Sequence, residues 1–65
     1  MVIVKYGTSI KACPDRYRAR LFIEALHKEA RVYENDLLIG RAWKHDNRWN
    51  WYIDNDGTLT HINAD

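Results

Sequence analysis

The sequence has little of the chemistry that usually holds a very small protein together. It contains 65 residues and one cysteine, which excludes an internal disulfide. No cluster of cysteine and histidine has the spacing of a structural zinc site, and no apolar run approaches the roughly 18 residues of a membrane span. A chain of this length buries roughly 60% of its unfolded surface. We therefore expect either an aromatic-rich core or self-association into a homodimer.

Neither sign of charge is in excess. Ten lysine and arginine residues stand against nine aspartate and glutamate residues, for a net charge of +1. Proteins that bind the phosphate backbone usually carry a stronger basic excess, so the balance favours a protein partner over nucleic acid. Any basic patch must come from an uneven distribution of these charges over the surface. The single thiol and the absence of a recognisable leader predict a cytoplasmic protein with no membrane partner.

Aromatic residues are plentiful, and their rings can fill the core of one domain over residues 1–65. The chain has three tryptophan, four tyrosine and one phenylalanine residues. At the N-terminal end, the β-branched and aromatic run at residues 2–6 predicts a strand that ends at Gly7. Residues 10–13 follow as a short return strand or an extended lead-in to a helix.

The middle of the chain predicts a helix from about Pro14 to about Arg31. Proline is favoured in a first helical turn, and Asp15 there suits the helix dipole. At about 100° per residue, one apolar stripe faces the core: Ala19, Phe22, Ile23, Leu26 and Ala30. Four basic residues form a secondary row, which is typical of a solvated helix face or, alternatively, of a rail for an acidic partner: Arg16, Arg20, His27 and Arg31.

The last 29 residues, from Leu37 to Asp65, predict an antiparallel meander. Its strands are expected at residues 37–45, 48–54 and 58–62. Asp46-Asn47 and Asn55-Asp56-Gly57 separate them, and these residue types tolerate the positive φ angles that tight hairpin turns require. The fold class is therefore α+β: a four- or five-stranded antiparallel sheet with one helix packed on one face, in the order β(β)αβββ.

Strand alternation gives the meander two unlike faces. If Asp46 and Asn47 form a two-residue turn, three residues of the second strand fall on a core face with a partner opposite each: Trp49 with Lys44, Trp51 with Ala42, and Ile53 with Gly40. We expect Leu38 to extend that face and Ile39 to lie on the other one. The other face carries the candidate partner-binding set, which is Arg41, Trp43, His45, Arg48, Asn50 and Tyr52.

Trp43 is the informative member of this set, because a large apolar ring on a polar strand face needs an explanation. Two explanations are structural: Arg41 or Arg48 covers the ring in a cation–π contact, or another segment of the chain folds over it. Two are functional. Tryptophan, tyrosine and arginine recur as hot spots of protein interfaces, and rings among cations also form platforms for nucleic-acid bases.

No catalytic or metal site is predicted. Cys13 lies near the start of the expected helix, where a thiol pKa is lowered, but no basic partner can be placed beside it. The histidines have no further ligand at metal spacing. The segment from Asp54 to Gly57 lacks the remaining ligands of a calcium loop, so it predicts a turn. We expect no enzyme activity and no cofactor.

The leading hypothesis is a small non-enzymatic binding protein. It would engage a protein partner through the face that carries Trp43, as an accessory or inhibitory factor of the kind common among stand-alone small chains, including those of phages and plasmids. The alternative is a nucleic-acid-binding module that uses the same face together with the basic helix row.

Overall fold

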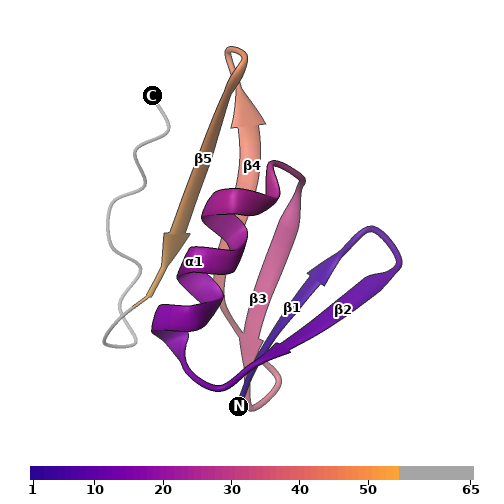
Figure 1. The fold of residues 1–65 in the computed structure, drawn as a ribbon, viewed down its shortest axis with the longest axis vertical. Helices are drawn as coiled ribbons and strands as arrows, with labels where there is room; N and C mark the ends of the chain where they lie inside the picture. The colour runs from indigo at the N-terminus through magenta and orange to yellow at the C-terminus, as the bar shows by residue number, and fades with distance from the viewer. Residues whose placement is uncertain (55–65) are drawn as a thin grey trace.

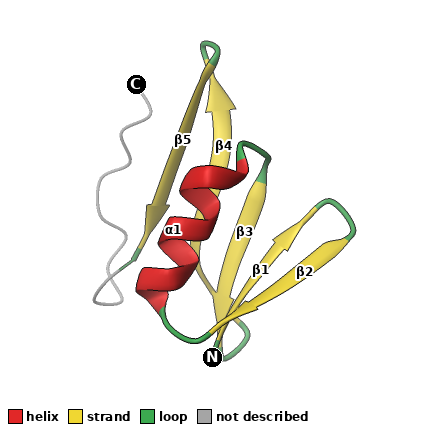
Figure 2. Cartoon of the chain, in the orientation of Figure 1, coloured by secondary structure: helices red, strands yellow, loops and turns green. Residues whose placement is uncertain are grey.

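The computed structural model describes residues 1–54, which form one antiparallel sheet with a helix across one face (Figures 1 and 2). The elements are β1 (Val2–Tyr6), β2 (Ser9–Cys13), α1 (Arg16–Leu26), β3 (Ala30–Glu34), β4 (Leu37–His45) and β5 (Arg48–Ile53). The five strands lie side by side in the order β2-β1-β3-β4-β5. The predicted α+β class and first strand are confirmed, and the observed order ββαβββ matches the predicted β(β)αβββ. Of the two alternatives for residues 10–13, the structure shows the return strand.

Tight turns at two hairpins have positive φ at both central residues. Asp46 and Asn47 have φ angles of 53° and 62°, and Asn35 and Asp36 have 53° and 65°. Backbone of this kind matches the right-handed twist of the flanking strands, and asparagine and aspartate tolerate it. The predicted two-residue turn between β4 and β5 is thereby confirmed, together with its register, in which Ala42 lies opposite Trp51.

The helix is shorter than the sequence indicated. It begins after Asp15, whose carboxylate accepts a hydrogen bond of 2.8 Å from the backbone N–H of Arg18. It ends at Leu26, because His27 adopts the left-handed conformation with φ 54°. The expected continuation to about Arg31 is wrong. Residues 30–34 form β3 instead, hydrogen-bonded to β1 on one side and β4 on the other.

β4 carries an irregularity that reverses two assignments. The register between β3 and β4 shifts between Val32 and Tyr33, so Tyr33 faces Leu38 and Ile39 has no partner of its own. Ile39 is buried in the core at 4% exposure, whereas Leu38 is 48% exposed. The sequence predicted the opposite, since simple alternation takes no account of an extra residue. The strand predicted at residues 58–62 lies outside the described residues.

The core lies between α1 and the sheet. Val4 and Val32 face each other across β1 and β3 and are fully buried, and Ala19 and Ile23 of α1 are buried with them. Of the other residues predicted for the helix stripe, Phe22 and Leu26 pack half-buried against this cluster, as does Trp51 from β5, whereas Ala30 is buried in β3. Within residues 1–54, no helix has the length and apolar character to cross a membrane.

Gly40 is expected to be the least substitutable position of the β4–β5 pair. A Cβ there would lie 2.5 Å from the Tyr52 carbonyl oxygen and 3.0 Å from the Ile53 side chain. Overpacking of this kind costs about 1–3 kcal/mol, so Gly40→Ala should lower the free energy of unfolding in urea by about that amount. Gly7→Asn is the control, because a Cβ added at Gly7 would meet no atom of residues 1–54 within 4 Å beyond its chain neighbours, and asparagine accepts the φ of 60° there. A Gly40→Ala protein as stable as wild type would contradict the β4–β5 register.

Candidate functional site

One face of the sheet is left uncovered by every element of residues 1–54. Helix α1 packs against the opposite face, the one turned toward the viewer in Figure 1. We call the uncovered side the open face. All six predicted partner-binding residues alternate onto it. The register places Arg41 opposite Tyr52, Trp43 opposite Asn50, and His45 opposite Arg48.

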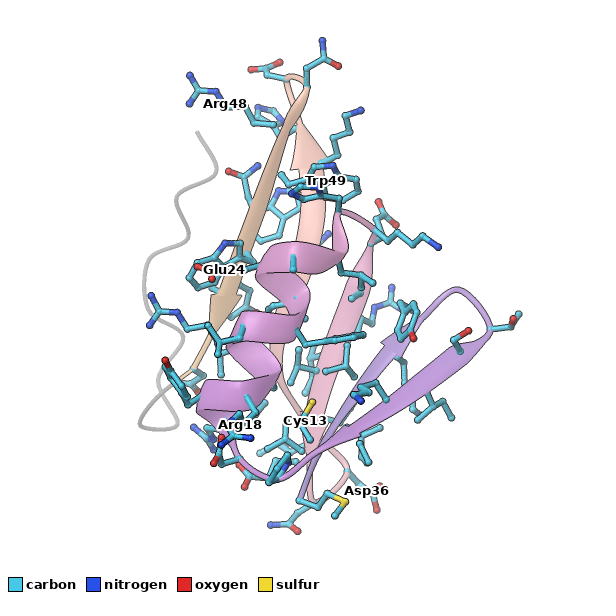
Figure 3. The ribbon with its side chains drawn as sticks, in the orientation of Figure 1. Cys13, Arg18, Glu24, Asp36, Arg48 and Trp49 are labelled. Atoms are coloured by element: carbon cyan, nitrogen blue, oxygen red, sulfur yellow. The ribbon has the colours of Figure 1, made fainter. Side chains whose placement is uncertain are left out.

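Trp43 is half-buried by its neighbours on the open face. The guanidinium carbon of Arg41 lies 4.9 Å from the centre of the Trp43 ring, so one predicted explanation, a cation–π cover, is present. The Tyr52 ring meets Trp43 edge-on, with 6.2 Å between ring centres, and Tyr52 itself is only 8% exposed. Arg48 makes no such contact and extends from the β4–β5 turn at the far end of the molecule (Figure 3). Trp43 is therefore anchored in place and still partly accessible.

Two further cations share the open face with Arg41, and neither was predicted to lie there. Lys5 of β1 lies directly opposite Arg31 of β3, and Arg31 lies directly opposite Arg41 of β4. We call Lys5, Arg31 and Arg41 the cationic row. Like charges directly opposite each other destabilise a sheet. Within residues 1–54, no carboxylate forms an ion pair with any of the three.

Tyr33 is the second aromatic ring of the open face that is partly exposed, and it too was missed. The Lys5 ammonium nitrogen lies 4.9 Å from the centre of its ring. Two hollows, of about 300 Å³ and 230 Å³, adjoin at Lys5 and Tyr33. Arg31 and Arg41 also line the larger hollow, where Glu29 is the one acidic lining residue. In the sequence, Ala30 and Val32 alternate with Arg31 and Tyr33, and this alternation could have predicted the strand. It was overlooked because the helix was expected to continue to about Arg31.

The predicted basic row on the helix does not exist as a continuous surface. The Arg16 Nε donates a hydrogen bond of 2.7 Å to the Glu34 carboxylate, and its Nη1 donates to the Asp54 carbonyl oxygen. Arg20 lies 4.8 Å over the Trp51 ring, and His27 stacks on Trp49 with 6.4 Å between ring centres. These three side chains hold α1 against the sheet. Arg31, the fourth, lies in β3 on the open face.

The environment of Cys13 does not favour a nucleophile. The thiol is buried between α1 and the sheet, and this burial raises its pKa above the ordinary value; Lys11 lowers the pKa and Asp15 raises it, both more weakly (Figure 3). The lowering expected near a helix start is therefore outweighed by desolvation. Across residues 1–54, histidine, cysteine, aspartate and glutamate side chains do not gather in any group of three or more that could hold a metal ion.

Comparisons of the chain with protein-family models, with curated proteins and with solved structures found no match. The geometry and charge of the open face are therefore the features that bear on function.

Cys13 is expected to react slowly in the folded protein. Its raised pKa leaves less thiolate at about pH 8 than an exposed cysteine would have, and burial blocks access to the sulfur. A colorimetric disulfide reagent should modify the native thiol at least about tenfold more slowly than the thiol of the protein unfolded in urea. Equal rates in the two states would contradict the burial of Cys13 under α1.

Proposed function

We propose that this chain is a small non-enzymatic binding protein whose open face binds single-stranded nucleic acid. The observation that carries the proposal is the cationic row, three like charges on adjacent strands with partly exposed rings on either side. Folding alone disfavours such a row, because its members repel one another across the sheet. A ligand that brings negative charge removes this cost.

A polyanion suits the dimensions of the row. Adjacent strands lie about 4.8 Å apart, so three cations on β1, β3 and β4 span about 10 Å. A phosphodiester backbone carries one negative charge per nucleotide and gives up condensed counterions when lysine or arginine neutralises it. The near-neutral charge of the whole chain is no obstacle, since the positive charge that matters is concentrated on one face.

The rings favour a single strand over a duplex. Unpaired bases can stack on tyrosine and tryptophan, and Tyr33 and Trp43 flank the cationic row. Reading a duplex usually requires an element that enters the major groove, most often a helix. On α1, the side chains of Arg16 and Arg20 are already engaged with Glu34 and Trp51 of the sheet side.

A protein partner is the second candidate, and a specific observation favours it. Tyr52 is nearly buried and Trp43 is partly covered, which limits ring area for stacking, while Leu38 and Ile10 are exposed apolar residues at the rim of the open face. An acidic protein surface could meet the cationic row and these apolar residues together. The chain would then act as an accessory or inhibitory factor. With either partner we propose a cytoplasmic setting, where the single thiol stays reduced.

The wild-type protein is expected to bind a fluorescent oligothymidylate of about 16 nucleotides in an anisotropy titration at low salt. If three phosphates are neutralised, affinity should fall about 20-fold when monovalent salt rises from about 50 to about 200 mM. Trp43→Ala should weaken binding by about tenfold or more, because it removes one stacking ring.

The melting temperature of Trp43→Ala separates a lost contact from a lost fold. Arg20→Gln serves as the matched control, since it removes one positive charge from the covered side of the sheet, where Arg20 lies over Trp51. Arg20→Gln should leave the oligonucleotide affinity within about twofold of wild type, because salt screens a charge on the far side of the sheet from the ligand. No binding by the wild-type protein at low salt would rule out the nucleic-acid proposal and leave the acidic protein partner.

A further inference from the structure

We infer that the bound strand runs along β3 and β4 and crosses the cationic row, with Tyr33 and Trp43 as two separate stacking sites. The inference rests on the proposed function and adds the path of the ligand and its minimum length.

The two rings lie on opposite sides of the cationic row. Tyr33 follows Arg31 by two residues along β3, and Trp43 follows Arg41 by two residues along β4. Because β3 and β4 are antiparallel and Arg31 faces Arg41, these two steps lead in opposite directions. Each step covers about 7 Å at the usual rise of a strand, so the rings stand about 14 Å apart along the strand direction.

Each ring is covered by a cation of the row in the unbound protein. The Lys5 ammonium lies over Tyr33 and the Arg41 guanidinium lies over Trp43, both at 4.9 Å from the ring centre. The side chain of Arg31, between them, makes no hydrogen bond, ion pair or ring contact within residues 1–54. A phosphate is a stronger partner for a cation than a ring face is, because the hydrogen bonds are charge-assisted.

Binding is therefore an exchange of contacts. Phosphates draw Lys5 and Arg41 away from the rings and meet Arg31 at the centre of the row, and a base takes the ring face that each cation leaves. The larger hollow lies on this path, since the whole cationic row and Tyr33 line it. A stacked strand advances about 3.4 Å per nucleotide, so about five nucleotides reach from one ring to the other.

Competition titrations with oligothymidylates of about two and about eight nucleotides test the path. Tyr33→Leu and Trp43→Ala should each weaken the longer ligand about tenfold, and their effects should multiply in the double variant, since the two sites are well separated. The shorter ligand should lose only about twofold with either single variant, because one ring remains for it. Arg31→Gln should lower the slope of log affinity against log salt by about 0.7.

Matched controls come from α1, on the other side of the molecule. Tyr17→Leu repeats the Tyr33→Leu change at a tyrosine that is 63% exposed on the helix, and Arg18→Gln repeats the charge loss of Arg31→Gln. Both should leave affinity and salt slope close to wild type. Tyr33→Phe keeps the ring and should keep the affinity, which separates stacking from any role of the hydroxyl.

Photo-crosslinking uses the wild-type protein, so its result does not depend on whether a variant folds. An eight-nucleotide ligand carrying iodouracil is expected to give adducts at both Tyr33 and Trp43 and none at Tyr17. Adducts at Trp43 alone, or a stably folded Tyr33→Leu protein with unchanged affinity for the longer ligand, would overturn the two-ring path and leave the proposed function standing. Binding of polyglutamate but of no oligonucleotide would overturn both, in favour of an acidic protein partner.

Discussion

The pairing of β3 with β1 on one side and β4 on the other is the constraint on which the rest of the structure depends. It joins the N-terminal hairpin to the β4–β5 hairpin in one sheet, and it places Val32 at the centre of the core. It also requires α1 to end at Leu26, so that the chain can return across the sheet. Since each face of a strand receives alternate residues, the same pairing turns Arg31 and Tyr33 outward.

The basic residues of the chain are divided between two tasks by this arrangement. Arg16 and Arg20 close the helix against the sheet through Glu34 and Trp51, where they contribute to stability. The cationic row lies on the other side and contributes repulsion. Net charge averages over the two groups and conceals the difference, which is why a chain of net charge +1 can align three cations on one face.

A local conflict of this kind is informative because sequences generally agree with their folds at every level except where function requires otherwise. The core, the turns and the cap at Asp15 all agree with the ββαβββ fold. The open face does not: it aligns three cations and leaves two rings partly accessible. We propose that a ligand accounts for these features.

The sequence by itself determined what depends on neighbours along the chain. Asp46-Asn47 specified a tight turn, and that turn set the register that brings Trp43, Tyr52 and the rest of the predicted set onto one face. Only the tertiary structure decided that residues 30–34 form β3. The residue pattern around Ala30 fits a helix equally well, and the segment is a strand because it pairs with β1 and β4. The tertiary structure also decided the burial of Ile39, which follows from the irregularity in the β3–β4 hairpin that simple alternation does not encode. It likewise decided that Lys5 lies opposite Arg31, because this pair depends on hydrogen bonds between β1 and β3, two strands distant in sequence.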